Sequence, residues 1–145
     1  MSDIDTGKAL VTSYLDAVSA LDVGGIATLF REDGKVLLPY APPGVPPAIE
    51  GQAAIDAYYR ALPDMATNLN FRDYQIFALD APGEFVAEYT SDSSMKATGA
   101  RYRNRYITRV TVRGAKIAVL AEFFNPVPLV EALGGHLSLP AAAAP

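Results

Sequence analysis

The stretch that decides the fold is RYRNRYITRVTVRGAKIAVLAEFF, residues 101–124. From Tyr102 to Val112, basic residues alternate with aromatic and polar ones, which is the two-residue period of a strand with two different faces. Arg113-Gly114 indicates a tight turn, and the mostly apolar run Lys116–Phe124 predicts the next strand. We therefore expect two long, antiparallel neighbouring strands near the end of the chain.

Two more strands are predicted upstream, on either side of a turn at Pro82-Gly83. Residues 68–79 alternate with period two, which puts Phe71 and Phe77 on one face. Phe85–Thr90 predicts the second of these strands, and the polar segment after it fits either a loop or a bulged strand start. The second half of the chain is therefore predicted to be mainly sheet.

The first half is predicted to be helical, because apolar residues recur at helical spacing over residues 6–21, 22–30 and 52–62. Thr6 and Asp22 are the expected N-caps of the first two helices. Val36–Leu38 is expected to be a short strand. Four prolines make residues 40–49 a loop that cannot join a sheet interior, since proline lacks the backbone donor.

Helices followed by antiparallel strands predict an α+β domain with its helices packed on one side of a sheet. A short C-terminal helix is expected at Val127–Leu133, before Gly134-Gly135. We place one domain at residues 1–138 and expect the Ala/Pro tail 139–145 to be disordered. A chain of 145 residues, half of them hydrophobic, is long enough for such a core.

Composition limits the environment and the partners. Cysteine is absent, no apolar run reaches the length of a membrane span, and the N-terminus lacks the regions of a signal peptide. We therefore expect a cytoplasmic protein with no membrane partner.

Four basic side chains share one face of the predicted long strand: Arg101, Arg103, Arg105 and Arg109. The chain as a whole is acidic, with a net charge of −4, which favours a solvated face or a subunit interface over nucleic-acid binding.

Several kinds of catalytic and binding site are disfavoured because the residues they require are missing. The one histidine, His136, lies between a glycine pair and the Ala/Pro tail, so a Ser-His-Asp triad and a histidine metal site are disfavoured. Neither of the glycine-rich phosphate-binding motifs is present. We expect no metal and no cofactor.

The candidate functional groups are polar side chains placed on apolar faces. Tyr14 shares the apolar stripe of the first helix, and is either a core tyrosine or a donor to a ligand oxygen. On the long strand, Tyr102, Asn104 and Tyr106 lie opposite the arginines, which suits the wall of a ligand cavity better than a dry core.

Glu122 stands among the apolar residues of the last predicted strand. A carboxyl there either pairs with an arginine of the neighbouring strand or has a raised pKa, and a raised pKa is what a general acid or base requires. Glu88 is a second carboxyl on a predicted strand, but it alternates with Phe85 and Ala87 and is therefore expected to face water.

Tyr14 and four segments together resemble the SnoaL-like branch of the NTF2-like, ketosteroid-isomerase-like superfamily over roughly residues 8–134. The segments are APGEFV (81–86), YRNRYI (102–107), EFFNP (122–126) and LVEAL (129–133). The resemblance implies a cone of strongly curved antiparallel sheet closed by three N-terminal helices. It also implies an internal pocket and a homodimer formed through the outer sheet face.

Only some of the family's functional residues have a counterpart in this sequence. Tyr14 matches the tyrosine donor of ketosteroid isomerases, but Leu38 stands where their proton-shuttling aspartate falls, and their second donor falls near Tyr106. The phenazine-biosynthesis proteins of the PhzA/PhzB type are also similar, and Glu122 matches their acid/base glutamate. Their histidine has no counterpart, because Arg72 stands near that position.

These matches imply an enzyme of the SnoaL-like type that isomerises, cyclises or dehydrates a small, mostly apolar or aromatic molecule without a cofactor. The catalytic residues would be Glu122, Tyr14 and Tyr106. The expected binding residues are Asn104, Tyr102, Leu38, Tyr58, Phe71 and Phe124. The alternatives are a non-catalytic protein that binds a hydrophobic ligand in the same pocket, and a subunit whose outer sheet serves assembly.

Overall fold

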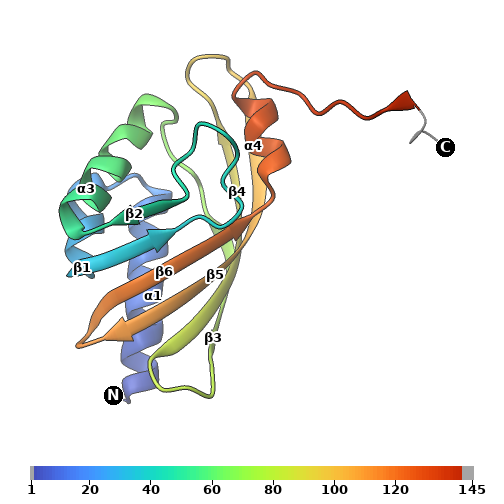
Figure 1. Cartoon of the computed structure of the whole chain (residues 1–145). Coiled ribbons are helices and arrows are strands. Elements are labelled where there is room, and N and C mark those ends of the chain that lie inside the picture. The colour runs from blue at the N-terminus through green and yellow to red at the C-terminus, as the bar shows by residue number, and fades with distance from the viewer. Residues whose placement is uncertain (1, 142–145) are drawn as a thin grey trace.

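The computed structural model describes residues 2–141, which form one curved six-stranded sheet with helices against its inner side (Figure 1). The helices are α1 (Asp3–Ser19), α2 (Val23–Ile26), α3 (Gln52–Ala61) and α4 (Pro126–Ala132). The strands are β1 (Phe30–Leu37), β2 (Ala48–Glu50), β3 (Arg72–Ala78), β4 (Glu84–Ser94), β5 (Arg101–Arg113) and β6 (Lys116–Phe124). Short 3₁₀ turns follow α2 and α3. The predicted α+β class is confirmed, with three N-terminal helices and a short C-terminal one.

The sheet is mixed rather than wholly antiparallel. Its order is β2-β1-β6-β5-β4-β3, and β1 runs parallel to β6 while every other neighbouring pair is antiparallel. β1 and β6 are separated in the chain by β2, α3, β3, β4 and β5, which provide the long connection that a parallel pair requires. This pairing places the N-terminal half of the chain beside β6, the strand that carries Glu122.

The first helix begins earlier than predicted. Thr6 is not its N-cap, because Ser2 and Asp5 form a capping box. The Ser2 hydroxyl accepts from the Asp5 amide at 3.1 Å, and the Asp5 carboxylate accepts from the Ser2 amide at 3.4 Å. This reciprocal pair satisfies amides that Thr6 would have left without partners.

The proline-rich loop is shorter than predicted. The four prolines stay outside the sheet, but Ala48–Glu50 forms the edge strand β2 on β1. Once the chain has passed Pro47, each amide can again donate to a neighbouring strand. β1 also begins at Phe30, six residues before the predicted start, with an irregular register before Lys35.

The predicted phase of β3 is wrong beyond Phe71. A bulge at Asp73, whose φ is 61°, moves the pairing from Arg72 opposite Thr90 to Gln75 opposite Glu88. The extra residue reverses the later side chains, so Tyr74 packs against the core while Phe77 is 45% exposed. On β4 the strand continues through Ser94, and Glu88 faces water as predicted.

The two faces of β5 agree with the alternation in its sequence. Arg101, Arg103, Arg105 and Arg109 are exposed on what we call the outer face, the side of the sheet away from α1. Tyr102, Asn104, Tyr106, Thr108 and Val110 are buried on the inner face. There they meet a core that includes Val11, Tyr14, Leu15 and Val18 of α1. Within residues 2–141, no helix combines the length and hydropathy needed to cross a membrane.

Candidate functional site

A cavity of about 110 Å³ is lined by residues of α3, of the inner face of the sheet and of α4. Tyr58 and Tyr59 come from α3, Tyr102, Tyr106, Glu122 and Phe124 come from β5 and β6, and Leu129 comes from α4. Most lining side chains are apolar or aromatic, and Glu122 is the only ionisable group other than tyrosines among them. The cavity therefore has the apolar walls and few polar groups of a small-molecule site.

Glu122 lies on β6 opposite Thr108 of β5, with its side chain toward the cavity. Burial raises the pKa of this carboxyl to about 7, against an ordinary value of 4.5, and a hydrogen bond from Tyr89 partly opposes the rise. None of the arginine ion pairs formed within residues 2–141 involves Glu122. Of the two readings left open by the sequence, the geometry matches the raised pKa and not the buried ion pair.

Tyr89 holds the Glu122 carboxylate, and sequence reasoning missed it. Its hydroxyl donates to Glu122 Oε2 at 3.0 Å and lies 2.6 Å from Thr108 Oγ1. Its ring stacks on that of Tyr106, with centroids 4.8 Å apart. A signal was present, because Tyr89 shares the inward phase of Phe85 and Ala87 on β4.

Tyr14 is fully buried and is not among the residues that line the cavity. Its hydroxyl lies 2.7 Å from that of Tyr59, which does line it. Burial raises the pKa of both phenols well above their usual value, so both keep their protons at neutral pH. The predicted first-helix tyrosine thus reaches the cavity through a neighbour.

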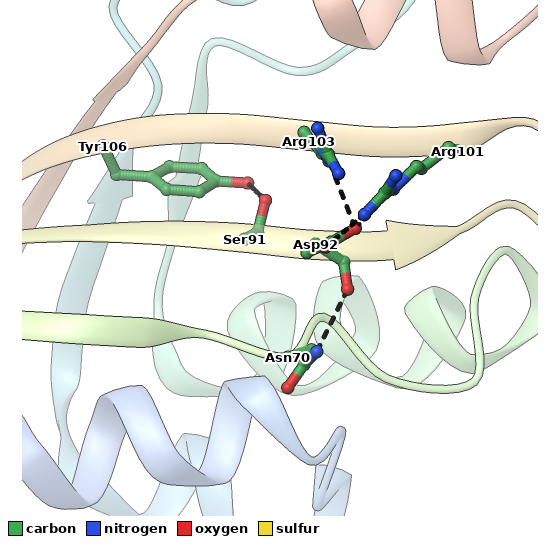
Figure 2. A network of polar contacts seen from close by, with 6 residues as sticks. All are labelled: Asn70, Ser91, Asp92, Arg101, Arg103 and Tyr106. Atoms are coloured by element: carbon green, nitrogen blue, oxygen red, sulfur yellow. Dashed lines mark hydrogen bonds and ion pairs between the residues drawn. The ribbon is translucent and has the colours of Figure 1, made fainter.

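The predicted residues of β5 form a connected chain of hydrogen bonds. Tyr102 and Tyr106 line the cavity, and Asn104 is buried behind them. Figure 2 shows the hydroxyl of Tyr106 directed at Ser91 of β4. The two hydroxyl oxygens lie 2.9 Å apart. On the outer face of the same strand segment, Asp92 pairs with Arg101 and Arg103, as the figure also shows. Adjacent residues of β4 therefore serve the cavity and the outer face.

The other predicted binding residues, Leu38, Tyr58, Phe71 and Phe124, all line the cavity. Sequence reasoning did not assign several other lining residues to the site, among them Leu62, Met65, Met95 and Leu129. They come from separate turns and from α4, so no common period marks them. Two of them are methionines, whose flexible side chains adapt to ligands of different shape.

The family profile of the SnoaL-like domain matches residues 11–120. The chain belongs to the SnoaL-like family. Its fold is also that of NTF2-like proteins such as one from Burkholderia xenovorans, at a TM-score of 0.72 and 18% identity over 88% of this chain and 95% of the other. The cavity just described is therefore set in a SnoaL-like domain.

Two further relatives support this assignment. This SnoaL-like chain is 32% identical to an uncharacterized PhzA/B-like protein of Pseudomonas aeruginosa, over 88% of this chain and 90% of the relative. An isomerase candidate from Bacillus subtilis superposes with a TM-score of 0.86 at 27% identity, covering 94% of this chain and 99% of that one. The alignments span nearly the whole domain in both chains.

Within residues 2–141 of this SnoaL-like domain, no three histidine, aspartate or glutamate side chains gather in a way that could hold a metal ion. The polar groups available at the cavity are one carboxyl and the hydroxyls of tyrosines. Such a set can accept a proton, return it, and donate hydrogen bonds to a developing negative charge.

Proposed function

We propose that this protein is an enzyme that moves a proton within a small, mostly apolar molecule by acid/base catalysis. Glu122 is the acid/base, and tyrosine hydroxyls of the cavity wall donate to the oxygen that gains charge. The observation that carries the proposal is a carboxyl on the wall of an apolar cavity, where burial raises its pKa to about 7. A group with this pKa is about half protonated at neutral pH, so it can both accept and return a proton.

The mechanism follows from these groups. Glu122 takes a proton from a carbon of the bound molecule, and the negative charge moves to an acceptor atom near the hydroxyls. The carboxylic acid so formed returns the proton to another carbon for isomerisation or cyclisation, or to a leaving hydroxyl for dehydration. Tyr89, whose hydroxyl is itself bonded to Thr108, keeps the carboxylate oriented throughout. No cofactor takes part in these steps.

Tyr14 and Tyr106 both act through a neighbouring tyrosine in this proposal. The Tyr14 hydroxyl contacts that of Tyr59, and the Tyr106 hydroxyl donates to that of Tyr102, which lines the cavity. We therefore assign both of them a positioning role. The cavity is smaller than the roughly 150 Å³ apolar cavity that binds benzene, so we expect a ligand no larger than about one ring.

The test is proton exchange. Small carbon acids such as cyclohexanone are incubated in D₂O with the wild type and with Glu122→Gln, and deuterium incorporation is followed by NMR. Exchange that exceeds the buffer rate and is lost in the variant supports the enzyme. If these molecules bind but neither protein accelerates exchange, the result favours the alternative function, a non-catalytic binder of hydrophobic ligands. The apolar walls of the cavity suit that function as well.

The homodimer is part of the proposal. Tyr40, Ile107 and Phe123 line one groove on the outer face, and Ile107 is 51% exposed. Glu88 and Arg105 lie in the same groove. A two-fold axis repeats every contact, so Glu88 of one subunit can meet Arg105 of the other twice in the same interface. This face can therefore pair with itself. A cytoplasmic location is also proposed, because a chain without cysteine fits a reducing compartment.

A further inference from the structure

Besides Glu122, the cavity is lined by tyrosines that belong to a chain of hydrogen bonds. This chain includes the side-chain amide of Asn104, whose orientation is set by its three partners. Asn104 Oδ1 accepts from the Arg105 amide at 2.8 Å. Its Nδ2 donates to the carbonyl oxygen of Asn125 and to the hydroxyl oxygen of Tyr102, each at 2.8 Å. Turning the amide over would face Nδ2 toward the Arg105 donor, so the Tyr102 oxygen must accept from Asn104.

A second donor reaches the same oxygen. The hydroxyl of Tyr106 donates to that of Tyr102 at 3.1 Å and is itself 2.9 Å from Ser91 Oγ, the contact drawn in Figure 2. Because Tyr106 has only one proton and gives it to Tyr102, Ser91 must be the donor to Tyr106. Two hydrogen bonds therefore end on the Tyr102 oxygen.

The proton of Tyr102 is left for the cavity. A phenol has one donor and two acceptor positions, and both acceptor positions of Tyr102 are used. Within residues 2–141 its hydroxyl donates to no acceptor, and the side chain lines the cavity. Accepting two hydrogen bonds also makes a hydroxyl a stronger donor, because hydrogen bonds in a chain polarise one another.

We propose that Tyr102 is the residue that recognises the ligand, by donating its hydroxyl proton to an oxygen acceptor on a small neutral molecule such as a ketone. Asn104, Tyr106 and Ser91 are positioning residues that aim and polarise this donor. The inference rests on the proposed function in one respect, namely that the oxygen bound by Tyr102 is the atom that gains charge when Glu122 removes a neighbouring proton. A cationic ligand does not fit this arrangement, since a proton and a cation would then face each other.

The experiment measures binding and hydrogen bonding separately from catalysis. Cyclohexanone labelled with ¹³C at its carbonyl is titrated into the wild type, Tyr102→Phe and Tyr106→Phe, with Tyr74→Phe as the matched control. The Tyr74 hydroxyl donates to Asp16 outside the cavity. A hydrogen bond to the carbonyl oxygen shifts the carbonyl carbon resonance downfield in the bound state.

We expect Tyr102→Phe to abolish the downfield shift and to weaken binding about 3- to 10-fold, the range for one net hydrogen bond. Tyr106→Phe should reduce the shift while leaving the Tyr102 hydroxyl in place, and Tyr74→Phe should change neither quantity. A merely structural role for Tyr102 would change affinity without selectively removing the shift.

Deuterium exchange separates this inference from the proposed function. Glu122→Gln should lose exchange but keep the carbonyl shift. If the wild type shows the shift without any exchange, the enzyme proposal fails and the assignment of Tyr102 stands. The assignment is overturned if Tyr102→Phe keeps the shift, if cyclohexanone does not bind, or if tetramethylammonium binds in its place.

Discussion

The pH dependence of stability gives the sharpest test of the environment of Glu122. Its pKa of about 7 in the folded protein exceeds the ordinary 4.5 by about 2.5 units. At about 1.36 kcal/mol per unit, ionising this carboxyl in the folded chain costs about 3 kcal/mol more than in the unfolded chain. That is a large share of the roughly 5–15 kcal/mol by which a typical domain is stable.

The sign follows from the direction of the shift. Below about pH 4.5 the carboxyl is protonated in both states, and no penalty exists. As the pH rises from 4.5 to 7 the unfolded chain ionises first, so the folded state loses stability. Above about pH 7 the full penalty is present. Glu122→Gln imitates the protonated form and should therefore match the wild type at low pH and exceed its stability by about 3 kcal/mol at pH 8.

The assay is urea denaturation of both proteins at several values between pH 4.5 and 8.5, together with carbon-detected NMR titration of Glu122. Glu88→Gln is the control, since Glu88 is exposed on the neighbouring strand β4. Its stability difference should stay within about 0.5 kcal/mol. A flat difference for Glu122→Gln, or a Glu122 pKa near 4.5, would refute the argument that burial dominates at this site.

Three further predictions use other contacts. Tyr89→Phe removes the hydrogen bond that lowers the pKa of Glu122, so NMR titration should find that pKa higher in the variant than in the wild type; an unchanged value would mean that the bond is absent in solution. Gly7→Ala would place a Cβ within the van der Waals radius of the buried Phe85 ring, so urea denaturation should show a loss of about 1–3 kcal/mol, whereas Gly24→Ala, with open space around it, should be neutral or slightly stabilising. Ile107→Glu should convert the proposed homodimer to monomer in sedimentation experiments, and a wild type that is already monomeric at micromolar concentration would remove the dimer from the proposal.

Much of the fold could be predicted because its signals are local. The two-residue period of β5 depends only on the backbone of that strand, and it correctly separated the exposed arginines from the buried Tyr102, Asn104 and Tyr106. The placement of Glu122 among apolar residues on β6 was equally local, and it was sufficient to raise the question of its pKa.

Other features depended on contacts that no local pattern records. The bulge at Asp73 reverses the faces of β3, because one extra residue changes the phase of all that follow. The edge strand Ala48–Glu50 exists only because β1 offers it an unpaired side.

The hydrogen bonds of the candidate site belong to this second class. Tyr89 meets Glu122 only because β4, β5 and β6 lie side by side in one register, with Thr108 between them. The chain that ends at Tyr102 likewise requires Ser91 of β4 to face Tyr106 of β5. On β5 and β6 the sequence alone determined which side chains point inward, because that choice follows the strand period where no bulge changes the phase. Only the tertiary structure decided which of them share protons, because a hydrogen bond requires two atoms about 3 Å apart, and that distance depends on strand register and packing together.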